Sequence, residues 1–228
     1  MRYQFFIKGE LIDLCIPSKL AIEKDGWADW FNDIEKLQAT EHGIYPNYIA
    51  AQQNILDSLA SDRSKIVLLV CEKVGNKAIG VISLQNINLQ NNSAEIALNV
   101  SSKNKSTINP LAALEAMALI TQHGFDQLGL IRIYASQAFP LLKNWNKGLE
   151  TIGYRSEGIL KNSFIRGHSV YDTVAISCLY ENYIKLKNLR GTLWGSAKII
   201  RKTMKKQPKH SFANVISDHL KVNEEKYF

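Results

Sequence analysis

The stretch Ile66-Val-Leu-Leu-Val-Cys-Glu72 opens the part of the sequence that decides the fold. It is an apolar run of strand length, and a second run follows at Ala78-Ile-Gly-Val-Ile-Ser-Leu84. Val74-Gly-Asn-Lys77 joins the two runs and is typical of a hairpin turn. A third segment, Ala94-Glu-Ile-Ala-Leu-Asn-Val100, fits a strand with one polar edge. These segments predict three successive strands.

The strongest helix signal of the chain follows these strands. Asn109 can cap a helix, Pro110 suits its first position, and an apolar stripe continues to Leu128, after which Gly129 ends it. Leu130-Ile-Arg-Ile-Tyr-Ala135 then has the pattern of a buried strand. A strand, a helix and another strand in this order imply a parallel or mixed sheet with helices on its faces.

The remaining segments add elements on both sides of this centre. They are a hairpin over Phe5–Ile16, one amphipathic helix or two short ones over Ser18–Leu37, a helix after Pro46, a loop over Gln85–Ser93, a helix over Leu141–Ile152, and strands at Tyr154–Leu160 and Val170–Cys178.

Length and composition suit one domain with an appendage, because 46% of the 228 residues are apolar. The longest apolar run is far shorter than the roughly 20 residues that span a bilayer, and the first residues lack the apolar core of a signal peptide. We therefore expect a cytoplasmic protein. The three cysteines and five histidines have no metal-ligand spacing, so no metal is expected.

Charge separates the chain into two predicted units, residues 1–184 and residues 185–228. The second unit carries 11 Lys or Arg against 3 Asp or Glu, a net of +8, which leaves the first unit at 17 minus 18, or −1. Apolar stripes at Leu193–Met204 and Phe212–Leu220 predict two basic amphipathic helices in the second unit. We expect them to pack on their own domain or on a second subunit as a homodimer; peripheral contact with an anionic membrane is the alternative. No nucleic acid partner is expected, because the body is neutral.

Six short motifs in the predicted core, over about residues 5–184, resemble the GNAT superfamily of acyl-CoA-dependent N-acyltransferases. Within it they resemble the branch of the ribosomal-protein alanine acetyltransferases. The motifs are Trp30-Phe-Asn-Asp33, His42-Gly-Ile-Tyr-Pro46, Lys77-Ala-Ile-Gly-Val-Ile82, Ser93-Ala-Glu-Ile-Ala97, His123-Gly-Phe125 with Leu130-Ile-Arg-Ile-Tyr134, and Ile152-Gly-Tyr154 with Glu157-Gly-Ile-Leu160. The resemblance implies an α/β fold with a mixed, mostly antiparallel twisted sheet flanked by helices, here followed by a C-terminal helical extension.

The same resemblance implies an enzyme that uses acetyl-CoA, or another acyl-CoA, as co-substrate to acylate a small-molecule amine. Relatives with the first two motifs look like enzymes that modify amino sugars, which predicts an amino sugar or nucleotide-linked amino sugar acceptor in surface-polysaccharide biosynthesis. Two alternatives stay open. One is a non-catalytic GNAT-fold binding or scaffold protein, and the other is a ribosomal-protein N-terminal acetyltransferase.

The resemblance also assigns residues to the co-substrate, although the glycine-rich loop of the family is absent. Asn109, Leu111 and Ala113 stand where the glycines of the family fall, and Pro110 removes one N–H donor. The helix dipole and the remaining amides would face the pyrophosphate. The predicted co-substrate residues are Leu98, Val100, Lys105, Asn109, Leu111, Ala112, Ala113 and Asn144.

Glu95 is the predicted general base, since it lies on the strand that borders the acyl site in the family; the competing reading is a solvated carboxylate at a strand end. Leu149 stands where relatives often have a tyrosine that protonates the leaving thiolate, and the sequence offers no direct substitute. The predicted substrate-binding residues are Trp30, Glu41, His42, Tyr45 and Tyr171. Glu41 is the next candidate for the base.

Overall fold

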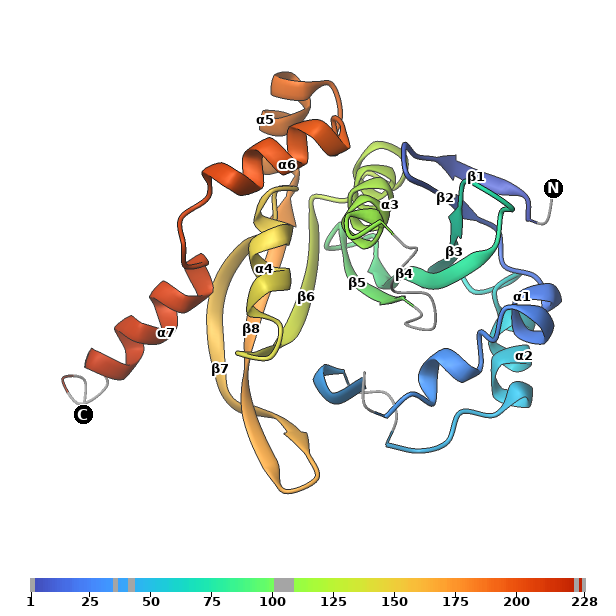
Figure 1. Cartoon of the computed structure of the whole chain (residues 1–228), viewed down its shortest axis with the longest axis horizontal. Helices are drawn as coiled ribbons and strands as arrows, with labels where there is room; N and C mark the ends of the chain where they lie inside the picture. The colour runs from blue at the N-terminus through green and yellow to red at the C-terminus, as the bar shows by residue number, and fades with distance from the viewer. Residues whose placement is uncertain (1–2, 35–36, 41–43, 101–108, 224–225, 227–228) are drawn as a thin grey trace.

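The computed structural model describes residues 3–34, 37–40, 44–100, 109–223 and 226. One eight-stranded sheet, in the order β1-β2-β3-β4-β5-β6-β8-β7, forms the centre of the protein (Figure 1). Every neighbouring pair is antiparallel except β5 and β6, which are parallel. The strands are β1 (Phe5–Lys8), β2 (Ile12–Cys15), β3 (Ile66–Glu72), β4 (Ala78–Asn88), β5 (Ser93–Val100), β6 (Arg132–Phe139), β7 (Arg155–Arg166) and β8 (Ser169–Leu179).

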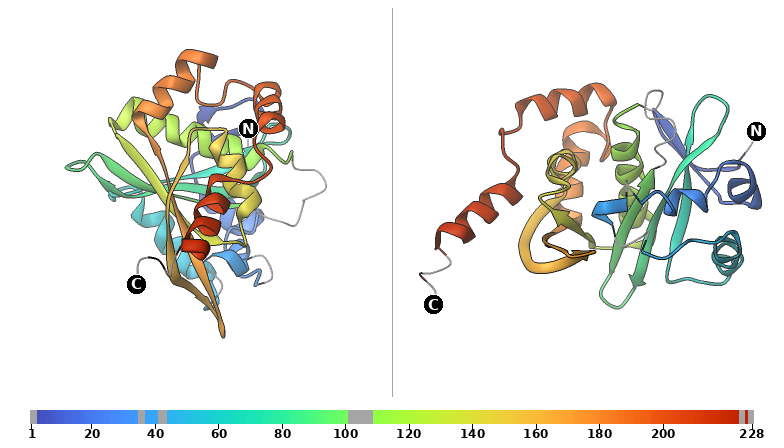
Figure 2. Two further views of the ribbon diagram at one scale, coloured as in Figure 1. Left: turned by 90° about the vertical axis from the view of Figure 1, so that its left-hand side faces the viewer. Right: turned by 60° about the horizontal axis from the view of Figure 1, so that its bottom comes forward.

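Helices cover both faces of the sheet and continue beyond its last strand (Figures 1 and 2). The helices are α1 (Lys19–Lys24), α2 (Ile49–Ser58), α3 (Ala112–Leu128), α4 (Lys143–Glu150), α5 (Tyr180–Arg190), α6 (Ala197–Lys206) and α7 (Phe212–Asn223), with short 3-10 turns η1 (Asp29–Phe31) and η2 (Leu37–Ala39). This arrangement confirms the predicted fold class of a mixed, mostly antiparallel sheet flanked by helices.

Strand β3 shows why the central strands are apolar on both sides. Leu68 and Val70 belong to the core cluster on the side of α3, whereas Leu69 and Cys71 belong to the cluster on the side of α1. Because successive strand residues point to opposite faces, a strand that is buried on both faces needs a continuous apolar run. The apolar pattern of residues 66–72 follows from this double burial.

Helix α3 begins two residues later than the sequence predicts. Asn109 Oδ1 accepts a 3.0 Å hydrogen bond from the N–H of Leu111, and Asn109 O accepts a 2.9 Å bond from the N–H of Ala112. This turn replaces the first helical turn that Pro110 was expected to start. Gly129 ends the helix as predicted, with a left-handed φ of 65°.

Other boundaries also differ from the sequence prediction. Strand β4 extends to Asn88, because Asn88 still pairs with Ser93 and the expected loop shrinks to a short turn. Strand β6 begins two residues later than predicted, at Arg132, and ends at Phe139. Strand β7 continues beyond its predicted end to Arg166, where it forms an irregular hairpin with β8. Over the described residues 18–34 the chain forms two short pieces, α1 and η1, and Gly26 between them takes a left-handed φ of 76°.

The residues after β8 form three helices rather than the two predicted. Helix α5 escaped sequence analysis because it buries only Tyr183 fully and so lacks an apolar stripe. Helix α6 is packed on the core through Ala197 and Ile200, and α7 buries Ala213 and Ser217. The predicted division between residues 184 and 185 falls inside α5, and it stays a prediction. Among the described residues, no helix combines the length and hydropathy that a membrane span requires.

Candidate functional site

Strands β5 and β6 run side by side for only three residue pairs and then separate. Ser93, Ala94 and Glu95 pair with Arg132, Ile133 and Tyr134. Beyond this point β5 continues to Val100 along β4, and β6 continues to Phe139 along β8 (Figure 1). We call the separation after Glu95 and Tyr134 the fork. A fork in a sheet leaves unpaired strand edges that a ligand can reach.

A pocket of about 650 Å³ lies over the sheet beside the fork. Its volume is in the usual range for small-molecule sites. Residues of β3, β4 and β5 form its floor, and the segments around α1, η1 and α2 form its walls. The lining residues are Trp27, Phe31, Ile44, Tyr45, Pro46, Asn47, Gln52, Ile55, Lys65, Val67, Val81, Ser83, Gln85, Ala97, Leu98 and Asn99.

The pocket combines aromatic side chains with neutral polar groups. Among its described lining residues Lys65 is the single charged side chain, and no carboxylate is present. Lys65 Nζ forms an ion pair with Asp62 at 3.0 Å. The Ser64 hydroxyl and then Lys65 lower the pKa of Asp62 to about 2, so this carboxylate is ionised at neutral pH. The pocket therefore suits a ligand with an apolar face and hydrogen-bonding groups.

Glu95 lies at the fork, next to this pocket. It pairs with Gln85, which lines the pocket, and paired residues on neighbouring strands share one face of the sheet. Its side chain is half-buried, and Glu95 Oε2 accepts a 2.9 Å hydrogen bond from Asn86 Nδ2. The predicted base thus stands at the boundary between the pocket and the separating strands.

Tyr134 is a neighbour of Glu95 that sequence analysis missed. It is the last residue of β6 that pairs with β5, and its register partner is Glu95. The guanidinium of Arg132 lies 5.7 Å from the centre of the Tyr134 ring, and Arg132 Nη1 bonds Glu157 Oε1 at 2.6 Å. A phenol beside a carboxylate is a usual pair for acid–base chemistry. The only sequence signal was a tyrosine at the end of a predicted strand.

The start of α3 offers fewer amides than the sequence predicted. The N–H groups of Leu111 and Ala112 are already bonded to Asn109, so in this structure they are not free for a phosphate. Ala113 carries the remaining predicted N–H donor, and among the described residues no backbone oxygen accepts a hydrogen bond from it. Asn109 satisfies these two N–H groups internally, and the co-substrate roles of Leu111 and Ala112 stay predictions.

The other predicted site residues are dispersed. Tyr45 lines the pocket, as does Leu98 on β5, and Val100 ends β5 opposite Gly80. Trp30 is not a pocket residue: it is 5% exposed in the core, and Trp27 and Phe31 line the pocket in its place.

Two more predicted residues lie away from the pocket. Tyr171 packs against Phe164 in the β7–β8 hairpin, with ring centres 6.1 Å apart, and Asn144 is exposed on α4. Glu41, His42 and Lys105 lie outside the described residues.

Two buried amide side chains, one on β6 and one on α4, have polar atoms without a hydrogen-bond partner among the described residues. Asn146 on α4 is 2% exposed, and neither its Oδ1 nor its Nδ2 atom is paired. Gln137 lies on β6 after the fork, and its Oε1 atom is also unpaired. Unpaired buried amides are rare in folded proteins and point to an absent ligand or water. In the sequence, Asn146 falls within the predicted helix over Leu141–Ile152 and carries no further signal.

The chain is similar to known proteins in its fold but not in its sequence. The sequence matches no family model and no curated protein. Among solved structures, a GCN5-related N-acetyltransferase from Brucella melitensis is 21% identical, with a TM-score of 0.64 over 87% of both chains. Spermidine N-acetyltransferase from Vibrio cholerae, in complex with CoA and spermine, is 16% identical, with a TM-score of 0.67 over 77% of this chain and 99% of that one. The chain has the GNAT fold.

The GNAT fold is also found in RimJ of Mycobacterium smegmatis, in complex with CoA-disulfide. RimJ is 17% identical to this chain, with a TM-score of 0.63 over 75% of this chain and 82% of RimJ. At these identities the likeness concerns the fold alone. In this GNAT fold, no group of three or more His, Cys, Asp or Glu side chains within the described ranges is placed to hold a metal ion.

Proposed function

We propose that the protein is an acyl-CoA-dependent N-acyltransferase that acts at the fork between β5 and β6. One observation carries the proposal: the carboxylate of Glu95 stands where the strands separate, beside a pocket of about 650 Å³. The solved structures with this fold include N-acetyltransferases, two of them named as complexes with CoA or a CoA derivative.

The residues beyond the fork suit the pantetheine arm of an acyl-CoA, which carries two amide groups. Asn146 and Gln137 are buried amides with unpaired atoms, and each matches an amide on the ligand as donor or acceptor. The N–H of Ala113 and the positive end of the α3 dipole remain for a phosphate. Among the described residues at the start of α3, the N–H groups of Leu111 and Ala112 are bonded to Asn109.

In the proposed reaction the acceptor amine attacks the thioester carbonyl carbon directly. Glu95 takes the proton that the attacking nitrogen loses, and backbone N–H groups at the unpaired edge of β5 stabilise the oxyanion. The new C–N bond forms, the C–S bond breaks, and the thiolate of CoA leaves with a proton. Tyr134, next to Glu95 in register, is the proposed donor of that proton.

The lining of the pocket supports an amino sugar, or its nucleotide-linked form, as the acceptor. Trp27 and Phe31 offer apolar surface to the C–H face of a sugar ring, and the neutral side chains of Gln85 and Asn99 can bond its hydroxyl groups. Lys65 can face a phosphate of a nucleotide-linked sugar. A polyamine fits less well, because no described lining residue is a carboxylate. A role in surface-polysaccharide biosynthesis rests on this acceptor.

Two other functions remain testable beside this one. Similarity to the fold of RimJ keeps a ribosomal-protein N-terminal acetyltransferase among the candidates. The closed turn at Asn109, which occupies the N–H groups of Leu111 and Ala112, favours a non-catalytic binding protein with this fold.

The deciding experiment has two stages. Calorimetry with acetyl-CoA comes first, and we expect heat of binding and a rise in melting temperature; neither effect at millimolar ligand would favour the non-catalytic protein. Release of free CoA thiol is then measured with an amino sugar, its nucleotide-linked form, spermine and an N-terminal ribosomal-protein peptide. Preference for the peptide or for spermine would overturn the sugar assignment.

A further inference from the structure

Helix α6 carries a line of cations that none of the roles above uses. Lys198, Arg201, Lys202 and Lys205 stand at spacings of three, one and three residues, which places them on one side of a helix. All four are exposed, and within the described part of the chain none forms an ion pair. They line a groove of about 290 Å³, which we call the α6 groove.

These cations repel one another along the helix. Lys198 and Lys202, like Arg201 and Lys205, are four residues apart, and α6 contains no acidic residue to offset them. The helix forms because its opposite side, with Ala197 and Ile200, is buried in the core. A rigid helix that holds four unpaired cations around one groove is preorganised for an anion with several charges.

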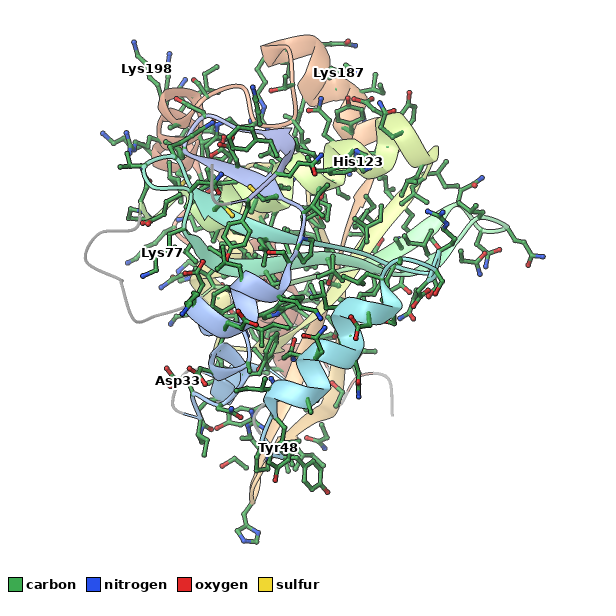
Figure 3. All side chains as sticks on the ribbon, turned by 90° about the vertical axis from the view of Figure 1, so that its right-hand side faces the viewer. Asp33, Tyr48, Lys77, His123, Lys187 and Lys198 are labelled. Carbon is green, nitrogen blue, oxygen red and sulfur yellow. The ribbon has the colours of Figure 1, made fainter. Side chains whose placement is uncertain are left out.

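Contacts at both ends of α6 place it near the start of α3. At its first residue, the N–H of Ala197 bonds Glu10 Oε2 at 2.7 Å, and the N–H of Glu10 bonds the side chain of Glu115 in the first turn of α3. After its last residue, Gln207 Nε2 bonds Lys147 O on α4 at 2.9 Å. In Figure 3, Lys198 lies toward one end of α3 and His123 toward the other.

On the other side, α4 also adjoins the first turn of α3. A Cβ added at Gly148 would lie 3.9 Å from Leu114 Cδ1. Helix α6 therefore connects two elements that both contact the first turn of α3. That turn is where the proposed function needs positive charge, and Asn109 has occupied two of its amides.

We propose that the α6 groove binds phosphate groups of the acyl-CoA co-substrate and adds positive charge beside the start of α3. This inference rests on the proposed function. CoA carries a pyrophosphate and a 3′-phosphate, and phosphate is the anion that Lys and Arg bind through charge-assisted hydrogen bonds. The C-terminal extension is then part of the co-substrate site.

The test compares two double variants of the full chain that each remove two positive charges. Arg201→Gln/Lys205→Gln changes the α6 groove, and Lys185→Gln/Lys221→Gln changes exposed lysines on α5 and α7. Calorimetry at low salt measures the Kd of acetyl-CoA, of acetyl-3′-dephospho-CoA and of S-acetylpantetheine, which has no phosphate. Melting temperatures show whether both variants fold.

We expect the groove variant to bind acetyl-CoA about ten-fold more weakly than the wild type and to bind S-acetylpantetheine unchanged. The control variant should bind acetyl-CoA within about two-fold of the wild type. Equal affinity of both variants for acetyl-CoA overturns the inference and leaves the proposed function intact. Failure of the wild type to bind any acyl thioester overturns the proposed function instead.

A second measurement, with lipid vesicles, distinguishes the phosphates of CoA from those of lipid head groups as ligands of the α6 groove. Sedimentation with vesicles of phosphatidylcholine and phosphatidylglycerol is measured for the same three proteins. Loss of vesicle binding in the groove variant, with unchanged acetyl-CoA affinity, assigns the α6 groove to lipid head groups and overturns the CoA assignment. Weak vesicle binding that is the same in all three proteins agrees with it.

Discussion

The indole Nε1 of Trp194 donates a 2.8 Å hydrogen bond to Glu10 Oε2, which joins residues 184 positions apart in the sequence. The same oxygen accepts the N–H of Ala197, the first residue of α6. Glu10 lies in the turn between β1 and β2. Glu115 of α3 holds this turn by accepting hydrogen bonds from the N–H groups of Leu11 and Ile12. One carboxylate thus fixes the start of the basic helix to the body of the protein.

Glu10→Ala should lower the free energy of unfolding by about 1–3 kcal/mol, because it leaves the Trp194 and Ala197 N–H groups without an acceptor. Glu10→Gln keeps an acceptor oxygen and should recover part of the loss. Urea unfolding measures both, and Glu181→Ala, an exposed change on α5, is the control. A stability for Glu10→Ala equal to that of the control contradicts the role of Glu10.

Glu95→Gln should reduce turnover at neutral pH by about 10²-fold or more, which is the usual loss when a general base is removed. The amide keeps the size of the side chain and an oxygen for Asn86, so the fold should be retained. Initial rates with acetyl-CoA and the best acceptor are compared with those of Glu181→Gln. Unchanged turnover would move the base to another residue.

Tyr134→Phe should lower kcat while leaving the KM for the acceptor near its wild-type value, because the proposed phenol acts on the leaving thiolate. An acyl donor with a more acidic thiol leaving group should restore part of the lost rate. Equal losses with both donors would assign Tyr134 to positioning instead.

Ala97→Trp should block the pocket, since Ala97 lies on its floor and the larger side chain would occupy part of the 650 Å³. We expect the KM of the acceptor to rise about ten-fold or more, with the Kd of acetyl-CoA unchanged. Calorimetry and initial rates give the two constants. A parallel loss of acetyl-CoA affinity would mean that the pocket holds the co-substrate rather than the acceptor.

His123 should make stability depend on pH just below neutrality. Burial lowers the pKa of His123 below its ordinary value of 6.5, so the folded protein binds this proton less tightly than the unfolded chain. The contribution of neutral His123 to the free energy of unfolding is therefore complete above pH 6.5. It is lost as the pH falls from 6.5 to the pKa of His123 in the folded state.

His123→Phe should remove this loss, and it keeps a ring to pack against Phe6, whose ring centre lies 5.1 Å from that of His123. The exposed turn residue His168, changed to Gln, is the control. The free energy of unfolding is measured between pH 5 and pH 8. The same pH dependence in wild type and His123→Phe would contradict the assignment.

Elements whose pattern is local could be predicted from the sequence. The apolar runs of β3 and β4, the turn at Gly75 and the stop of α3 at Gly129 depend on neighbouring residues alone, and all were predicted. Glu95 was also chosen from the sequence, through its position in a motif, and its role as the base stays a prediction. Helix α5 was missed because it buries one residue completely and so has no periodic signal.

The composition of the candidate site depends on contacts between segments that are distant in the sequence. The fork exists because β6 leaves β5 after Tyr134 to follow β8, and the pairing of distant strands is not written in the pattern of either one. The pocket joins Trp27, Lys65 and Asn99 from separate elements. The bond from Trp194 to Glu10 likewise depends on packing between the two ends of the chain. Local periodicity fixes which face of an element is buried, whereas register and packing fix what that face meets.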